Sequence, residues 1–425
     1  MTLAIFLGTL GGALAIGVPV AFALILCALT MGLYLDLFDP QILAQRMVVG
    51  ANSFPLLAIP FFLLAGELMN AGGMSKRIIA FAGSFLGHRR GGLGFVAIFA
   101  AVIMASLSGS AAADTAALIA MLLPMMRAAG YETGRAVGLM ASGGTIAPII
   151  PPSIAYIIFG VATNVSITQL FLAGIVPGLM MGIGLAITWA IVSRRDNVEV
   201  MPRQGLQARL KATGAAMWSL GMPVIILGGI RFGIVTPTEA AVIAAVYAMF
   251  VGMVVHRELS LQAIYEALRN AAVTTAVVML LAAAALTTSW FIAIADLSGV
   301  VMDLVEPLAD NPTLLLVVIM ALVLVIGMAL DMGPTILILA PVLLPVVEGA
   351  GIDPVYFGVL FVINCAIGLV TPPVGIVMSV ASGVAKLPLH TVIKGSLPFV
   401  LTQILVLFLL VLFPQLVLAP LEFLR

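Results

Sequence analysis

The stretch that most constrains this chain is Ala141-Ser-Gly-Gly-Thr-Ile-Ala-Pro-Ile-Ile-Pro-Pro-Ser153, which combines helix-breaking residues with hydroxyl side chains. It lies inside a run that is apolar enough to sit in a bilayer. Pro148, Pro151 and Pro152 lack a backbone N–H and interrupt a helix. Hydrocarbon offers no water, so a broken helix at membrane depth needs protein or a polar cavity over its free backbone groups. Transporters bind ions and solutes at such breaks, so we expect half of a transport site here.

The composition predicts a membrane protein. Of the 425 residues, 63% are hydrophobic and 8% are charged, whereas soluble domains have about 25% charged residues. Repeated apolar runs of about 20 residues indicate transmembrane helices, so we expect an all-α polytopic membrane protein. The first run, residues 3–35, carries Gly17-Val-Pro19, which allows a kink. Cys27 and Cys365 lie in apolar segments and are interpreted as small core residues.

Charges in the loops predict the orientation of the chain. Basic residues cluster at 74–91, 127–135 and 194–211, and short loops rich in Lys and Arg stay cytoplasmic. The loops on the other side carry only acids in the second half: Asp296, Asp303, Glu306, Asp310, Glu348 and Asp353. This pattern predicts about 11 transmembrane helices, with the N-terminus cytoplasmic and the C-terminus periplasmic.

Two apolar runs, 92–127 and 312–347, are too long for one helix, and each has charges of one sign at both ends. We interpret them as re-entrant hairpins, with tips at Ser108-Gly-Ser110 and Asp331-Met-Gly-Pro334. Each hairpin is followed by a span with a break, at residues 136–163 and 354–385.

An internal repeat relates these segments. At an offset of 221 residues Pro151-Pro152 falls on Pro372-Pro373, and Leu122-Leu-Pro124 falls on Leu343-Leu-Pro345. Bases flank the first hairpin and acids flank the second, so we expect two inverted repeats, a signature of elevator-type secondary transporters. The predicted division is a scaffold of 1–90 and 236–311, a transport domain of 91–192 and 312–420, and a cytoplasmic loop with a linking helix at 193–235.

The breaks and tips carry the candidate chemistry. Na⁺ prefers oxygen ligands, which unwound carbonyls and helix C-termini supply, whereas helix N-termini attract an anionic solute. The repeat therefore predicts two cation sites with a solute between the tips. The predicted Na⁺ residues are Ser108, Ser110, Gly143, Thr145, Asp331, Thr335, Asn364, Gly368 and Thr371. The predicted solute residues are Gly109, Pro151, Pro152, Ser153, Pro372, Pro373 and Gly375. Asp114 is expected to support the ion site, or to cap or anchor the hairpin's second arm.

Other interpretations of these residues stay open. Small residues also serve close helix packing, as in Gly8…Gly12 and Gly178…Gly182, although packing does not require Pro-Pro at both repeat positions. The three histidines, His88, His256 and His390, lie at basic span ends, and no P-loop pattern occurs. We expect no enzyme. An intramembrane protease would have to pair Asp114 with Asp331, and a simple channel is a further alternative.

Several motifs in this order resemble one family. They are Pro55-Leu-Leu-Ala-Ile-Pro60, Leu107-Ser-Gly-Ser110 with Ala113-Asp114, Gly143 to Ser153, Thr236-Pro-Thr-Glu-Ala240 and Gly368-Leu-Val-Thr-Pro-Pro-Val-Gly375. The chain resembles the large, DctM-like membrane subunit of tripartite ATP-independent periplasmic (TRAP) transporters over nearly its whole length.

The resemblance implies Na⁺-driven uptake of a carboxylate through the bacterial inner membrane by an elevator motion. It also implies a small DctQ-like membrane subunit and a DctP-like periplasmic binding protein, with no nucleic acid and no covalently bound cofactor. A sugar acid or keto acid is expected rather than a simple four-carbon dicarboxylate. The alternative is a stand-alone Na⁺/divalent-anion symporter with a similar inverted-repeat fold.

Overall fold

Helices make up all the regular structure of the part of the chain that the computed structural model describes, which is residues 1–195, 198, 202–309 and 311–424. Within these residues, eight helices are long and apolar enough to cross a membrane. The predicted all-α membrane architecture is therefore confirmed, while the number of 11 spans stays a prediction. Asp310 and the side chain of Glu306, which contributed to the predicted orientation, lie outside the described set.

The first apolar run forms two helices. α1 (Thr2–Ala15) and α2 (Val20–Tyr34) are separated at Gly17, whose φ of 83° is left-handed, and at Pro19, which precedes α2. The two helices fold back on each other, with the hydroxyl oxygens of Thr9 and Thr30 3.2 Å apart. The expected kink is thus a complete turn.

The remaining helices of the first half follow in chain order. They are α3 (Pro40–Ala51), η1 (Phe54–Leu57), α4 (Ala58–Ala71), α5 (Met74–Leu86), α6 (Gly92–Ser108), α7 (Ala111–Ala128), α8 (Thr133–Gly144), α9 (Ile154–Thr163), α10 (Ile167–Val192) and η2 (Ser193–Arg195). Local sequence explains several starts. Asp39 accepts a hydrogen bond from the Gln41 N–H with Pro40 at the first position of α3, and Ser110, Ser153 and Ser166 cap α7, α9 and α10.

The second half has α11 (Leu206–Arg231), α12 (Pro237–Phe250), the π-helical turn η3 (Val251–Val255), α13 (Leu261–Ile294), α14 (Leu297–Ala309), α15 (Pro312–Gly327), α16 (Met332–Gly349), α17 (Pro354–Gly368), α18 (Ile376–Ala385), α19 (Leu389–Leu412) and α20 (Gln415–Leu424). Each of α15 to α19 begins within one residue of the position 221 residues after the start of its counterpart among α6 to α10. The Pro151-Pro152 and Pro372-Pro373 peptide bonds are both cis. The helix bounds therefore follow the repeat, and the inversion of one copy relative to the other stays a prediction.

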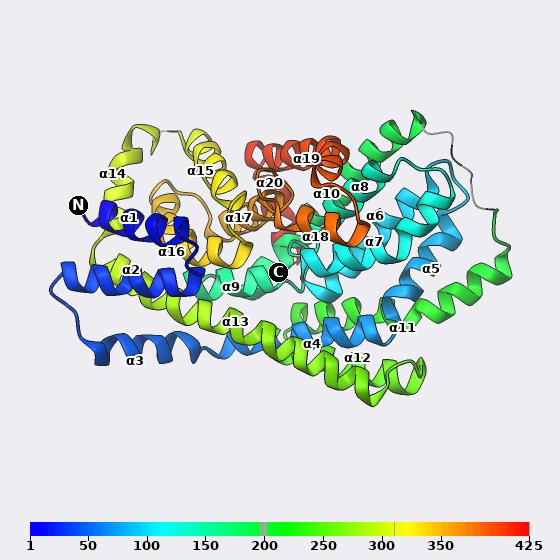
Figure 1. Ribbon diagram of the computed structural model, residues 1–425, viewed down its shortest axis with the longest axis horizontal. Coiled ribbons are helices and arrows are strands. Elements are labelled where there is room, and N and C mark those ends of the chain that lie inside the picture. Colours follow the sequence, from blue (N-terminus) through cyan, green and yellow to red (C-terminus); the bar gives the residue numbers. More distant parts are fainter. Residues whose placement is uncertain (196–197, 199–201, 310, 425) are drawn as a thin grey trace.

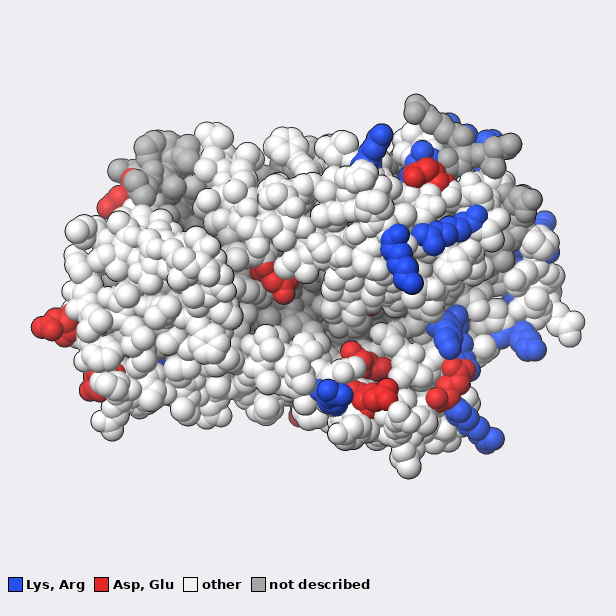
Figure 2. All heavy atoms as spheres, viewed as in Figure 1, with Lys and Arg blue, Asp and Glu red and all other residues white. Residues whose placement is uncertain are grey.

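Helices from the two halves are interleaved. α8 packs on α19, α7 on α18, α9 on α16, and α10 on both α17 and α19. A second group, in which α13 packs along α2, α3 and α4 while α12 packs on α4, forms the lower edge in Figure 1. Lys and Arg gather toward the right-hand end of the face in Figure 2, with several acids among them, whereas the left-hand end shows mainly acids. The basic side chains on this face are therefore concentrated toward one end of the long axis.

The crossing of α8 and α19 depends on glycine. A Cβ added at Gly138 would meet the backbone of Gly395 and Ser396, and one added at Gly395 would meet the backbone of Gly134. Such close approach is typical of small residues at membrane-helix interfaces. Gly178 and Gly182 also pack closely, against Ile150 and Val102, as the sequence indicated. The same interpretation of Gly8…Gly12 is wrong within this chain, since neither has a neighbour within 4 Å.

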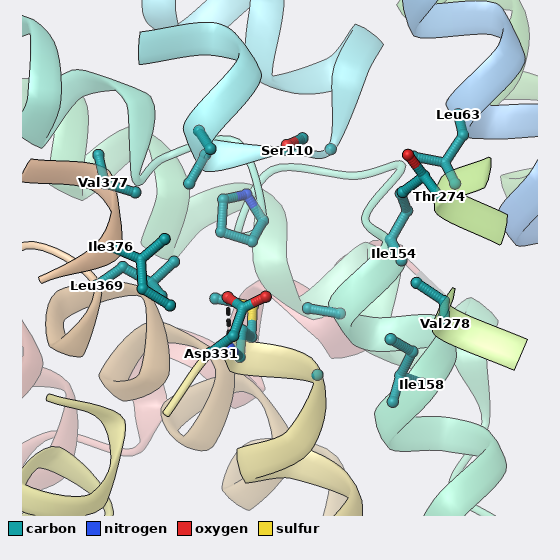
Figure 3. Close-up of a pocket in the computed structure, with 17 residues that line it drawn as sticks. Leu63, Ser110, Ile154, Ile158, Thr274, Val278, Asp331, Leu369, Ile376 and Val377 are labelled. Carbon is teal, nitrogen blue, oxygen red and sulfur yellow. Dashed lines mark hydrogen bonds between the residues drawn. The ribbon is translucent and has the colours of Figure 1, made fainter. Parts of the chain in front are cut away.

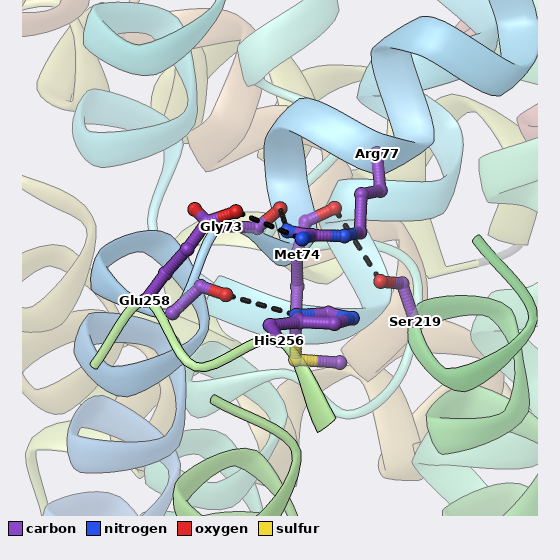
Figure 4. Close-up of polar contacts among 7 residues, drawn as sticks. Gly73, Met74, Arg77, Ser219, His256 and Glu258 are labelled. Atoms are coloured by element: carbon purple, nitrogen blue, oxygen red, sulfur yellow. Dashed lines mark hydrogen bonds and ion pairs between the residues drawn. The ribbon is translucent and has the colours of Figure 1, made fainter. Parts of the chain in front are cut away.

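A polar junction joins the α4–α5 joint to the segment between η3 and α13 (Figure 4). Arg77 on α5 contacts Glu258 with an N–O distance of 2.8 Å and also donates to the Gly73 carbonyl. His256 lies 2.9 Å, Nδ1 to O, from the Gly72 carbonyl. Burial and the nearby Arg77 charge lower the pKa of His256, while the hydrogen bond from Arg77 lowers the pKa of Glu258. The junction therefore favours neutral His256 and ionised Glu258.

We expect Gly138→Ala to lower the free energy of unfolding by about 1–3 kcal/mol, because backbone cannot move aside as a side chain can. Thermal unfolding of the detergent-purified protein measures this. Gly83→Ala is the matched control, because no atom lies within 4 Å of an added Cβ there and Ala favours helix over Gly. Equal melting temperatures for the two variants would contradict the close α8–α19 contact.

We expect acidification to destabilise the junction. His256 and Glu258 both have folded-state pKa values below their ordinary values of 6.5 and 4.5, so the unfolded chain takes up each proton first as pH falls. Stability should thus fall below about pH 6.5. His256→Gln keeps a donor for the Gly72 carbonyl without titrating, and should flatten the dependence of melting temperature on pH between about 7 and 5. His390→Gln, at an exposed site, should leave the slope unchanged; a slope equal to wild type in both would refute the assignment.

Candidate functional site

A cavity of about 210 Å³ lies where both hairpin tips and both helix breaks meet. Gly109 and Ser110 line it from the tip between α6 and α7, and Asp331 from the tip between α15 and α16. Pro148 and Leu369 line it from the two breaks. The wall is completed by the first residues of α9 and α18 and by Leu63 of α4 with Thr274 and Val278 of α13 (Figure 3). Segments far apart in sequence thus share one cavity.

Four helices begin at this cavity: α7, α9, α16 and α18. Helix N-termini carry partial positive charge and unsatisfied N–H groups, so they attract anions. Ser110 and Ser153 cap α7 and α9 through their hydroxyls, with N–O distances of 3.4 Å. No side chain caps α18, which begins after Gly375 in a left-handed conformation with φ 52°. The cavity is therefore electrostatically suited to an anionic group.

Among the described residues, Asp331 is the one acid that lines this cavity, and Figure 3 shows its carboxylate turned into it. Its Oδ1 accepts a hydrogen bond of 2.8 Å from the Met332 N–H at the start of α16. Thr335, one turn later, is buried and donates to the Asp331 carbonyl. The second carboxylate oxygen of Asp331 makes no hydrogen bond within the described residues, so it can accept one from a solute hydroxyl or contact a cation.

The predicted cation residues of the first repeat lie behind the tip. Ser108 donates to Asp114 Oδ1 at 2.5 Å, and its oxygen accepts from the Ser110 N–H. Ser110 is the N-cap of α7, and Asp114 lies in the first turn of the same helix. The hydrogen bond between Ser108 and Asp114 therefore anchors the tip to the start of α7. Thr145 donates to the Ser142 carbonyl at the end of α8. Gly143, in the last turn of α8, is buried.

Gln403 of α19 was not anticipated from the sequence. It is fully buried, and its Nε2 donates to both the Ser142 carbonyl and Thr145 Oγ, each at 2.8 Å. A lone amide inside the apolar helix Leu389–Leu412 was the signal that could have indicated it. Gln403 ties the last long helix to the break in the first repeat.

The predicted cation residues of the second repeat surround the end of α17. The Asn364 amide nitrogen donates to the Met320 carbonyl of α15 at 2.5 Å. Gly368 lies against the backbone of Gly327, and Thr371 donates to the Ile367 carbonyl. Of the predicted solute residues, Gly109 lines the cavity, whereas Pro151, Pro152 and Ser153 are buried beside it and Pro373 is exposed. Pro372 and Gly375 belong to the turn before α18.

Several buried oxygens near the breaks have no hydrogen-bond donor among the described residues: Asp114 Oδ2, Thr115 Oγ and Ser142 Oγ in the first repeat, and Asn364 Oδ1 and Gln403 Oε1 in the second. Leaving a buried polar group unpaired costs about 1–3 kcal/mol. A hard cation with oxygen ligands, or a water, satisfies such atoms. These oxygens are therefore chemically suited to a hard cation such as Na⁺ or to a water.

Comparison with known proteins agrees with this architecture. Residues 7–416 match the family described as "Tripartite ATP-independent periplasmic transporter, DctM component". The chain is 53% identical over 425 residues to the 2,3-diketo-L-gulonate TRAP transporter large permease of Escherichia coli, covering 100% of both chains. It is 40% identical over 404 residues to the sialic acid TRAP transporter large permease of Vibrio cholerae, covering 95% of each.

A solved structure has the same fold at low sequence identity. The Alcanivorax borkumensis YdaH transporter superposes with a TM-score of 0.68 at 17% identity, covering 88% of this chain and 89% of that one. The curated relatives are transporter permeases and not enzymes. The resemblance inferred from the motifs is confirmed, and the chain belongs to the DctM family of TRAP transporter large permeases.

Proposed function

We propose that this chain is the large membrane subunit of a TRAP system that takes up an organic acid with Na⁺ coupling. The observation that carries the proposal is the meeting of two hairpin tips and two helix breaks at one cavity. The relatives named for 2,3-diketo-L-gulonate and sialic acid suggest the solute class, a sugar acid or keto acid. No resident cofactor is part of the proposal, and Na⁺ is the coupling ion.

The solute carboxylate is held by the helix N-termini around the cavity. Each such terminus contributes roughly 0.3–1 kcal/mol toward an anion when exposed, and up to about 2 kcal/mol when partly buried. Asp331 would repel that carboxylate, so it faces the solute's hydroxyl groups and accepts their hydrogen bonds. Leu63, Ile158 and Val278 offer an apolar wall to the carbon chain. This division of polar and apolar surface favours a hydroxylated acid.

Na⁺ is held behind the two tips. Ser108, Ser110, Gly143 and Thr145 supply oxygens in the first repeat, with Asp114 and Gln403 supporting them. Asp331, Thr335, Asn364, Gly368 and Thr371 supply them in the second repeat. Bound cations offset the charge of the solute, because a single charge at the bilayer centre costs about 2.5–3.5 kcal/mol on insertion scales. Cation and anion binding are thereby coupled.

Transport follows an elevator motion in the proposed mechanism. The two inverted repeats contribute residues 91–192 and 312–420 to one moving domain, while 1–90 and 236–311 form the scaffold. The central cavity supports this division, because its walls come from α7, α9, α16 and α18 on one side and from α4 and α13 on the other. Leu63 and Val278 are apolar, so sliding breaks few hydrogen bonds there.

The proposed setting is the bacterial inner membrane, with the N-terminus cytoplasmic and the C-terminus periplasmic. The partners are a small membrane subunit and a periplasmic binding protein that delivers the solute. Reconstitution into proteoliposomes tests this: uptake of 2,3-diketo-L-gulonate should require an inward Na⁺ gradient, the small subunit and the binding protein. Uptake that needs no binding protein would support the stand-alone symporter instead. Equal uptake with an inward K⁺ gradient in place of the Na⁺ gradient would contradict the proposed Na⁺ coupling.

We expect Asp331→Asn to reduce uptake at least about tenfold. A neutral amide keeps the cap on Met332, but it accepts hydrogen bonds from solute hydroxyls less strongly and coordinates a cation less strongly than a carboxylate does. Initial rates in the same proteoliposomes measure this. Asp353→Asn is the matched control, because Asp353 also caps a helix, accepting from the Tyr356 N–H at 2.9 Å, without lining the cavity. Equal rates for the two variants would contradict the assignment of Asp331.

We expect Gln403→Met to raise the Na⁺ concentration for half-maximal uptake roughly tenfold, because the Ser142 carbonyl and Thr145 lose their shared donor. Na⁺ activation curves at saturating solute measure this effect. Gln262→Met, at an exposed site where the amide contacts exposed Glu266, is the control. A Gln403 variant with lower maximal rate but unchanged Na⁺ activation would assign the residue to folding alone.

A further inference from the structure

A second polar pocket, of about 370 Å³, lies between α3, α13 and the turn that joins α9 to α10. Its polar residues are Arg46 and Ser53 from the α3 side, Asn164 from the turn, and Ser289 with Trp290 from α13. No predicted ion or solute residue lines it. The pocket is therefore distinct from the central cavity.

Arg46 is the cation of this pocket. Its guanidinium carbon lies 4.5 Å from the centroid of the Trp290 ring, a cation–π arrangement that fixes the guanidinium plane. Among the described residues no acceptor hydrogen-bonds to Arg46. Asp39, on the same helix, is occupied by the Gln41 N–H and lies about 10 Å away along the helix axis. The N–H edge of Arg46 is thus free for a planar anion, which a guanidinium binds in a bidentate manner.

The other polar groups of the pocket extend this chemistry. Asn164, whose left-handed φ of 57° ends α9, makes no hydrogen bond within the described part of the chain. The hydroxyls of Ser53 and Ser289 line the same space. An amide and two hydroxyls can bond to the hydroxyl or keto oxygens of a small organic acid whose carboxylate is on Arg46.

Two helices connect this pocket to the central cavity. On α9, Ile158 lines the central cavity and Val161 lines the second pocket, a separation of about 4.5 Å along the axis. On α13, Val278 and Leu286 line the two spaces in the same way, about 12 Å apart. The two spaces are thus lined by nearby stretches of the same two helices.

We propose that the Arg46–Trp290 pocket is an outer docking site, where the carboxylate of the solute binds before it reaches the central cavity. The inference rests on the proposed function, which supplies the anionic solute and the periplasmic orientation of this end. The loops predicted on that side carry mostly acids, including Asp36, Asp39 and Asp296. Those acids repel an anion, so the unpaired guanidinium of Arg46 provides a local attraction.

The experiment uses the complete complex in proteoliposomes with 2,3-diketo-L-gulonate as the solute. Arg46→Gln should raise the concentration of loaded binding protein at half-maximal uptake roughly tenfold, the size expected for losing a charge-assisted hydrogen bond at a partly exposed site. The maximal rate should change less, because the central cavity is intact. Arg231→Gln is the matched control, since Arg231 lies over the Phe232 ring at 5.8 Å and lines neither pocket. If uptake depended on the concentration of loaded binding protein in the same way for both variants, the proposal would be overturned.

A second arm distinguishes the solute from a lipid headgroup. The comparison is repeated in vesicles of phosphatidylcholine alone and in vesicles that also contain phosphatidylglycerol. A defect of Arg46→Gln in both supports the docking site. A defect that occurs only with the anionic lipid assigns Arg46 to a headgroup and overturns it.

A third arm is independent of uptake and separates this inference from the proposed function. Trp290 is one of three tryptophans, and Trp290→Phe identifies its share of the fluorescence. In the wild-type complex, anionic trichloroacetate should quench the Trp290 fluorescence more strongly than neutral trichloroethanol does. Adding 2,3-diketo-L-gulonate should remove this excess of quenching by the anion. Arg46→Gln should abolish the excess. Without such an excess in the wild type, the pocket binds no carboxylate, whatever the uptake assay gives.

Discussion

Every backbone N–H and carbonyl in the hydrocarbon region needs a partner, and this requirement shapes the whole structure. Two breaks after α8 and α17 and two hairpin tips leave helix ends in the interior of the protein. Those ends are acceptable only where they face one another, other side chains or a polar cavity. The close packing of α8 on α19 and of α9 on α16 covers them and leaves one shared space between.

The chemistry of the shared space follows from which ends face it. The N-termini of α7, α9, α16 and α18 meet at the cavity and favour negative charge there. The C-terminal ends of α8 and α17 lie beside buried oxygens that lack donors among the described residues, such as Thr115 Oγ next to Gly144 and Asn364 Oδ1 within α17. We propose that these opposite helix ends form adjacent regions for an anion and for cations. In the proposed function this proximity is the physical basis of coupling.

Glycine and glutamine make the interleaved arrangement possible. Gly138 and Gly395 allow two backbones to touch where any larger side chain would separate them. Gln403 then reaches across the same pair of helices to the Ser142 carbonyl and Thr145. The break in the first repeat is thus held by a helix from the second. The Arg46–Trp290 pocket lies outside this arrangement, next to the C-terminal end of α9.

The sequence by itself determined the membrane class, the family, the positions of the breaks and the 221-residue repeat of helix bounds. Helix-breaking residues and apolar runs act through the residues themselves and their near neighbours, so the sequence alone shows where they are. It also placed Gly109, Ser110 and Asp331 at the tips, where they line the cavity. The turn between α1 and α2, the role of Gln403 and the pocket of Arg46 were decided by tertiary structure. Each depends on which helices pack together, and a lone amide or arginine in the sequence does not name the distant residue that it meets.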